Sequence, residues 1–290
     1  MQRNKKILHI GLVTLILSLL LSLGFVTYTR LDQPVFLCNY KESNILSVEG
    51  YYSKRHFNFS YITNAGDSRH VVGISFPGAE AIELSVVDAY TWLTPEFIHN
   101  YGHYTVRDVN VTIEDLDLTT RFDPLELSIG TVTLDNGETM EVDFGRVVIT
   151  NHGDNYPTTQ FLSSNSSGSS DQENQNISTF KASEDLKLIR VESPLFQDLG
   201  SMLTLEINGL ALKDIEGMMF KKGDTITVKT AIAPTRELNS TFTSYEVQPL
   251  LTWQDEKGDS HTQILFSINY SPYRFQLSGI LKYLKERGVF

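Results

Sequence analysis

The chain has 290 residues, a formal net charge of −11 and 41% hydrophobic residues, which is enough apolar content for a packed core and too much for a disordered chain. Its acidic balance argues against nucleic-acid binding, because phosphate backbones attract positive surfaces. The single cysteine, Cys38, excludes an intrachain disulfide, so the core itself must hold the fold.

The amino-terminal segment is predicted to cross a membrane. Residues 7–29 contain no Asp, Glu, Lys or Arg, and they follow Arg3, Lys5 and Lys6. About 20 apolar helical residues cover the roughly 30 Å hydrocarbon core of a bilayer. The positive-inside rule then makes residues 1–6 a cytoplasmic tail and places the bulk of the chain outside the cell. The alternative is a signal peptide cleaved after Ser22-Leu23-Gly24, but the apolar run continues through Val26, which favours a retained single-pass anchor.

Residues 30–40 are predicted to be a short tether between this helix and the first folded unit. Cys38 lies within the tether, and three interpretations of it stay open: an idle or buried thiol, pairing with a second chain, and lipidation. The preceding Val35-Phe36-Leu37 does not form a lipoprotein box, since it lacks small residues and is separated from the apolar run.

Residues 41–160 are predicted to form an acidic β-sandwich. Apolar residues alternate with polar ones, which is typical of half-buried strands, over 56–62, 71–76, 82–86, 105–113 and 125–129. Two further strands, 131–134 and 139–144, flank Asp135-Asn136-Gly137-Glu138, whose Asn-Gly pair favours a tight hairpin turn.

A second β-sandwich is predicted over residues 181–290. The Ser- and Asn-rich segment 161–180 has few apolar residues to bury, so it is interpreted as a flexible linker. Alternating patterns then recur over 186–191, 203–207, 225–229, 245–253 and 262–268, with a hairpin loop at 255–259. A capping serine at Ser278, apolar positions at helical spacing and a final Gly predict an amphipathic helix over 278–288.

The expected fold class is therefore mainly β: one transmembrane helix, two antiparallel β-sandwich domains and a short carboxy-terminal helix. The strand spacing resembles the immunoglobulin-like and fibronectin-like sandwiches of bacterial surface proteins. That resemblance implies a fold and no function.

Charge is distributed unevenly along the chain. Residues 35–160 carry 7 basic and 18 acidic side chains, whereas residues 161–290 carry 13 and 16. An acidic surface attracts cations, and carboxylates on loops between strands are the ligands that Ca²⁺ prefers. The candidate calcium ligands are Asp108, Glu114, Asp115, Asp117 and Asp123. The competing interpretation is a solvated strand edge that discourages aggregation.

Other metal and catalytic signals are weak. His99 and His103 are four residues apart, but the Asn100-Tyr101-Gly102 between them argues against a helix that would bring them together. The chain has no Gly-x-Ser-x-Gly, Walker or dinucleotide motif, and no cofactor other than calcium and no catalytic residue is predicted.

These observations favour a membrane-anchored extracellular binding or accessory module that contacts another envelope protein or a wall polymer. Two alternatives stay open: a surface hydrolase with a carboxylate-based site, and a calcium-stabilised surface scaffold.

Overall fold

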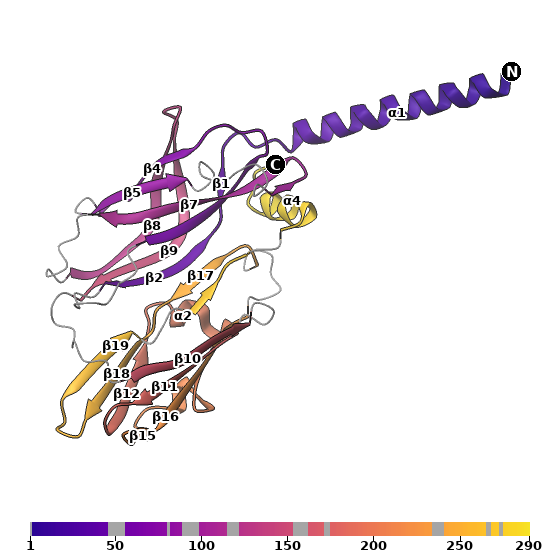
Figure 1. The fold of residues 1–290 in the computed structure, drawn as a ribbon. Coiled ribbons are helices and arrows are strands. Elements are labelled where there is room, and N and C mark those ends of the chain that lie inside the picture. Colours follow the sequence, from indigo (N-terminus) through magenta and orange to yellow (C-terminus); the bar gives the residue numbers. More distant parts are fainter. Residues whose placement is uncertain are drawn as a thin grey trace.

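The computed structural model describes residues 2–45, 56–79, 82–88, 99–114, 122–152, 162–170, 175–233, 241–264, 268–272 and 275–290. Helix α1 (Gln2–Tyr28) projects from a body of β-sheets, and helix α4 (Leu277–Glu286) lies beside its base (Figure 1). The fold is mainly β with an apolar amino-terminal helix and a carboxy-terminal helix, as the sequence predicts.

Helix α1 has the length and composition of a membrane span. The stretch His9–Tyr28 contains no Asp, Glu, Lys or Arg, and none of it is buried in the body. Both of its threonines are satisfied within the helix, since Thr14 and Thr27 each donate a hydrogen bond of 2.9 Å to the carbonyl four residues earlier. An uncovered apolar surface of this length suits a lipid environment.

Two sheets enclose the first core. Sheet A has the order β1 (Val35–Phe36), β3 (His56–Asn64), β7 (Tyr104–Glu114), β5 (Glu83–Asp88), and β6 (Asn100–Tyr101) also pairs with β7. Sheet B has the order β20 (Ile268–Tyr270), β17 (Ser244–Val247), β2 (Asn39–Ile45), β9 (Thr139–Asn151), β8 (Phe122–Leu134), β4 (Val71–Ser75). Aromatic rings fill the space between the sheets, with the Phe59 and Phe144 centroids 4.7 Å apart.

A second pair of sheets lies further from α1 (Figure 1). Sheet C has the order β10 (Leu162–Ser170), β11 (Gln175–Ala182), β16 (Thr225–Ile232), β13 (Leu203–Ile207), β14 (Leu210–Ala211). Sheet D has the order β15 (Met219–Phe220), β12 (Leu186–Glu192), β18 (Leu250–Asp255), β19 (Ser260–Ile264). Short helical turns, α2 (Phe196–Leu199), η4 (Gly200–Met202) and η5 (Leu212–Asp214), precede β13 and β15. The fully buried Trp253 belongs to this core.

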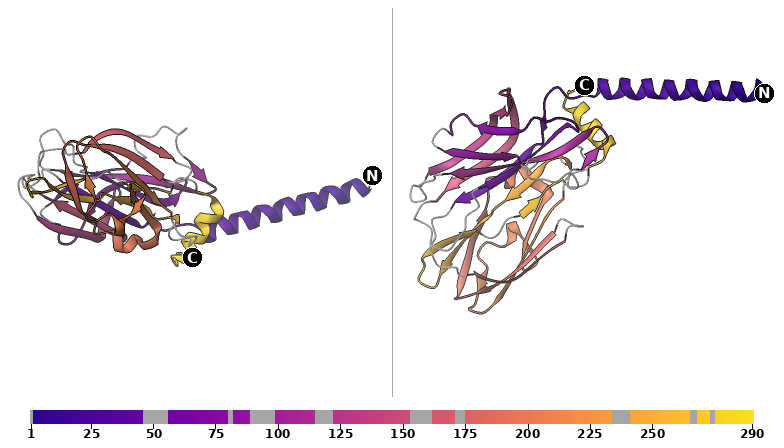
Figure 2. Two further views of the ribbon diagram at one scale, coloured as in Figure 1. Left: turned by 90° about the horizontal axis from the view of Figure 1, so that it is seen from below. Right: turned by 45° about the horizontal axis from the view of Figure 1, so that its top comes forward.

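Sheet B departs from the antiparallel arrangement predicted for both domains. Its strand β2 pairs in parallel with β9 on one side and with β17 on the other. Because β17 and β20 come from the second half of the chain, one mixed sheet contains strands from both halves. Figure 2 shows the orange and yellow strands of the second half reaching the indigo-to-magenta strands of the first. Local alternation reports which face of a strand is buried, but it does not report its partner or direction.

The segment 245–253, predicted as one strand, is divided between two sheets. Strand β17 ends at Val247 in sheet B, and β18 begins at Leu250 in sheet D. Pro249 lies at the division. Because proline has no amide donor for a sheet ladder, the break falls where the backbone cannot continue pairing.

The structure also contains strands where the sequence predicts a tether and a linker. Within 30–40, β1 pairs antiparallel with β3, and β2 begins at Asn39. Within 161–180, β10 pairs with β11, and β11 pairs with β16. Segment 30–40 buries apolar side chains of its own, Leu31, Phe36 and Leu37, which order it against the body. In strand β10 the sequence is polar, and the ladder of backbone pairs with β11 supplies the order.

The predicted hairpins and the carboxy-terminal helix are confirmed. Gly137 has a φ of 85° and its amide donates to the Leu134 carbonyl, so the Asn-Gly turn joins β8 to β9 as expected. The Asp255 amide donates to the Asp259 carbonyl in the second hairpin. Helix α4 begins at Leu277, and its N-cap is Gln276, so the predicted Ser cap is wrong by two residues.

Candidate functional site at the base of the helix

The end of α1 is held by hydrogen bonds to the β-sheet body. Thr29 and Leu31 are each only 2% exposed. The Leu31 amide donates to Asn64 Oδ1 at 3.0 Å, and Asn64 Nδ2 donates to the Leu31 carbonyl at 2.7 Å. The Tyr104 hydroxyl donates to the Thr29 carbonyl. The backbone groups that directly follow the helix therefore find partners in the body, and the junction is an ordered joint.

His103 contributes a second contact to this joint. Its Nε2 lies 2.7 Å from Thr29 Oγ1, and its ring packs edge-on against Phe25 with centroids 5.6 Å apart. Because Thr29 Oγ1 donates its only proton to the Phe25 carbonyl, it accepts from His103, which places the imidazole proton on Nε2. Burial lowers the His103 pKa, so the neutral imidazole is favoured.

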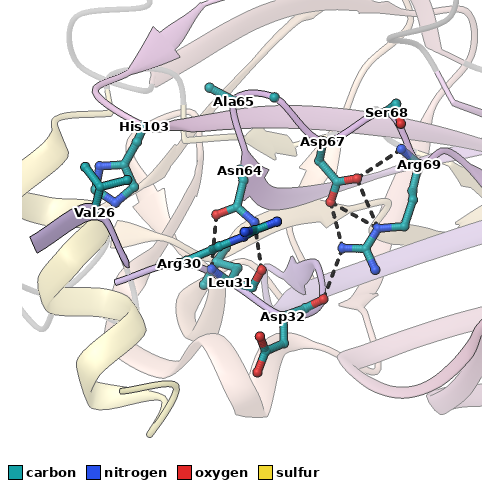
Figure 3. A pocket seen from close by; sticks show the side chains of 11 residues that line it. Val26, Arg30, Leu31, Asp32, Asn64, Ala65, Asp67, Ser68, Arg69 and His103 are labelled. Atoms are coloured by element: carbon teal, nitrogen blue, oxygen red, sulfur yellow. Dashed lines mark hydrogen bonds and ion pairs between the residues drawn. The ribbon is translucent and has the colours of Figure 1, made fainter. Parts of the chain in front are cut away.

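A cleft of about 760 Å³ opens beside this joint. Figure 3 shows Val26 and His103 at one end and the turn carrying Asp67, Ser68 and Arg69 at the other. Eleven residues line it: Val26, Arg30, Leu31, Asp32, Asn64, Ala65, Gly66, Asp67, Ser68, Arg69 and His103. The wall thus runs from a residue of the apolar helix to a set of charged side chains, a combination that suits a ligand or surface with both apolar and charged parts.

The far wall of the cleft is fixed by an ion-pair network. Arg69 Nη2 lies 2.8 Å from Asp67 Oδ2, and its Nη1 lies 2.7 Å from Glu138 Oε2. Burial would raise the pKa of Asp67, but hydrogen bonds from Arg69 and Thr63 outweigh it and lower that pKa to about 2. Both carboxylates are therefore committed to Arg69, which also donates to the Asp32 carbonyl at 3.0 Å.

Two charged side chains of the cleft are uncommitted. Among the residues that the structure describes, the Arg30 guanidinium and the Asp32 carboxylate have no hydrogen-bond or ion-pair partner. Both follow α1 directly, so they stand where the apolar helix meets the β body. Arg30 is thus available to an external anion at the base of the helix.

A separate buried polar cluster lies where the two halves of the chain meet. Glu42 of β2 is 2% exposed, and it accepts hydrogen bonds from Ser193 Oγ at 2.6 Å and from Asn44 Nδ2 at 2.8 Å. The Gln248 amide also donates to Glu42, at 3.3 Å. Burial raises the Glu42 pKa to about 7 despite these donors. A strand from the first half is thereby tied to residues 193 and 248 of the second.

The predicted calcium ligands are dispersed or lie outside the described residues. Asp108 and Glu114 are six residues apart on β7, roughly 20 Å at about 3.3 Å per residue, so these two do not share an ion. Ser60 donates to Asp108 Oδ1 at 2.6 Å. Asp115 and Asp117 lie outside the described residues, and only the backbone of Asp123 is described, in β8. Within the described part of the chain, no three His, Cys, Asp or Glu side chains gather as a metal site would require.

Sequence reasoning missed the cleft because its walls come from three distant segments, 26–32, 64–69 and 103. Of the residues it singled out, His103 belongs to the cleft, although in contact with α1 and not in a metal site. His99 precedes β6 and does not line the cleft. The one local signal was position, since Arg30 and Asp32 are the first charges after the apolar run.

Comparison with protein-family models and with curated protein sequences gave no match. Among solved structures, the YadV chaperone is similar with a TM-score of 0.25 and 7% identity, over 82% of this chain and 99% of that one. A protein of unknown function from Porphyromonas gingivalis W83 is similar with a TM-score of 0.22 and 11% identity, over 80% and 97% of the two chains. At TM-scores this low, the likeness carries no information on function.

Proposed function

We propose that the chain is a single-pass membrane protein whose two immunoglobulin-like units act outside the cell as a binding or accessory module for another envelope component. The observation that carries the proposal is the joint at Thr29–Leu31, where an uncovered apolar helix passes without a flexible break into the folded body. A helix whose end is bonded to the body is suited to hold that body at a fixed place against the membrane.

The contacts of residues 25–31 favour retention of α1 over its removal. Cleavage after Gly24 would leave Phe25 as a new charged amino terminus, although its ring packs on His103 and its carbonyl accepts from Thr29. Those contacts order the last helical turn, and a charged amino terminus at Phe25 would stand beside the neutral His103 ring that packs on it.

Site-specific cross-linking in intact membranes tests the binding role. A photoactivatable residue replaces Ser68 at the cleft or Lys213 on the second unit, and the matched control carries it at Ser18, on the apolar helix. The proposal predicts a discrete cross-linked envelope component from position 68 or 213 and none of the same mass from position 18. Absence of any such product, together with turnover of a screened polymer or peptide substrate by the purified chain, would overturn it.

A further inference from the structure

We propose that the exposed side of α4, together with Arg30, binds the anionic headgroup layer of the membrane that α1 spans. The inference rests on the proposed retention of α1 as an anchor. It adds a second membrane contact, which would fix the orientation of the body about the single helix.

Helix α4 lies at the end of the body from which α1 departs. It packs in one cluster with the residues that follow α1, because Ile280, Tyr283 and Leu284 share a buried core with Leu31 and Leu37. The Tyr28 and Phe290 ring centroids are 6.1 Å apart. In all views of Figures 1 and 2, α4 lies on the side of the body from which α1 departs. A bilayer around α1 would therefore have its headgroups next to α4.

The two lysines of α4 are on its exposed side. Ile280, Tyr283 and Leu284 are buried against the body, whereas Lys282 and Lys285 are exposed. With 3.6 residues per turn, the two lysines lie close together on the opposite side of the helix from that buried face. The side of α4 that carries them is thus turned away from the body.

The segment that contains α4 is basic, unlike the first half of the chain. Residues 35–160 carry a net charge of −11, but residues 275–290 carry three basic side chains and one acidic side chain. Arg30, which has no partner among the described residues, adds a further cation at the same end. The acidic residues nearby include Asp32 and Glu286, Asp67 in the cleft, which is paired with Arg69, and Asp143, whose charge acts on Tyr283. A basic end on an acidic body is complementary to anionic lipid, and headgroup phosphates attract lysines within a Debye length.

Arg287 follows α4 and is exposed, but it is left out of the proposed contact because its charge also acts on the body: burial raises the pKa values of Tyr283 and Cys38, and Arg287 lowers them. The contact therefore depends on Lys282, Lys285 and Arg30, and removal of the two lysines should be enough to abolish it.

The test uses the full chain with Cys38→Ser and a nitroxide label on Ser278→Cys, an exposed position on the lysine side of α4. The chain is reconstituted in vesicles of phosphatidylcholine alone and in vesicles of equal parts phosphatidylcholine and phosphatidylglycerol. Continuous-wave saturation then measures collision of the label with oxygen and with a neutral nickel chelate. Flotation of the vesicles after a carbonate wash reports whether the anchor holds.

The inference predicts that phosphatidylglycerol lowers nickel access and raises oxygen access at position 278, and that high salt reverses the change. Lys282→Glu with Lys285→Glu should abolish the response. Lys213→Glu with Lys222→Glu, an equal charge change at exposed positions of the second unit, should preserve it.

Each other outcome overturns a distinct claim. Equal access in the two vesicle types, or an unchanged response after the α4 substitutions, rejects lipid binding by α4 and leaves an acidic protein as the remaining candidate partner for this helix. Failure of the chain to float with either vesicle rejects the retained anchor, and with it the proposed function.

Discussion

Glu42 should make the stability of the folded chain fall as pH rises through a defined window. In the folded state, burial raises its pKa from 4.5 to about 7, whereas the unfolded chain returns it to the ordinary value. Between these two values the folded state binds the proton and the unfolded state does not, so raising the pH favours unfolding. A pKa difference of about 2.5 between the folded and unfolded states corresponds to about 3 kcal/mol of folding free energy. That stabilisation is fully present below the unfolded pKa and is lost above pH 7.

The perturbation that isolates this effect is Glu42→Gln. The side-chain oxygen of the glutamine can still accept from Ser193 and from the Gln248 backbone amide. Its NH₂ group, however, would face Asn44 Nδ2, which is also a donor, so the variant loses that hydrogen bond. The informative quantity is therefore the pH dependence of the free energy of unfolding, and not its absolute value. Urea unfolding of the full chain in detergent micelles, followed by tryptophan fluorescence from pH 4 to pH 8.5, gives the free energy of unfolding at each pH.

The wild type should lose about 3 kcal/mol more than Glu42→Gln between pH 4.5 and pH 7.5. The matched control, Glu216→Gln, removes an exposed carboxyl and should reproduce the wild-type slope. Identical slopes in the wild type and Glu42→Gln would refute the argument that burial dominates the titration of this carboxyl.

Two further substitutions test the packing of β2 and the helix joint. Gly145 has a φ of 88°, and a Cβ there would press on the Asn39 carbonyl. Gly145→Ala should therefore lower the free energy of unfolding, measured in urea, by more than about 3 kcal/mol. Gly137 has a φ of 85° but lies in open space, so Gly137→Ala should lower it by only about 1 kcal/mol. Comparable losses in these two variants would contradict the close approach of β9 to β2. Asn64→Ala leaves the Leu31 amide and carbonyl without their partner, so it should cost about 1–3 kcal/mol and increase hydrogen exchange at residue 31; unchanged exchange there would contradict the ordered joint.

The elements that sequence reasoning recovered are those whose signal is local. Alternation placed β3, β7, β12 and β16, and the Asn-Gly pair placed the turn between β8 and β9. Over most of their length one face of these strands packs on a core and the other is more exposed, so the two-residue period is visible in the sequence; β3 departs from it near its end, where Tyr61 and Ile62 are both buried.

Strand β2 could not be recognised in this way. Its sequence, Asn39-Tyr40-Lys41-Glu42-Ser43-Asn44-Ile45, reads as a polar connection, yet nearly all of it is buried. The polar side chains are satisfied by partners far along the chain, such as Gln248 Oε1, which accepts from the Asn44 amide at 2.9 Å. Such hydrogen bonds depend on the tertiary structure, whereas composition alone predicts that these polar residues are exposed.

The cleft could not be predicted for a related reason. Arg30 and Asp32 were visible as charges that follow the helix, but Asn64, Arg69 and His103 reach them only because β3 and β7 are neighbours in sheet A. No spacing in the sequence reports that adjacency, and Asp108 and Glu114, the two candidate calcium ligands whose side chains the structure describes, do not line the cleft.

The central claim is that α1 stays on the chain and holds the body at the membrane. Intact-mass and amino-terminal analysis of the protein, isolated from cells after carbonate extraction of the membranes, tests it most directly. We predict recovery in the membrane pellet of a chain that still contains residues 7–29. A soluble chain that begins at Phe25 would contradict the account.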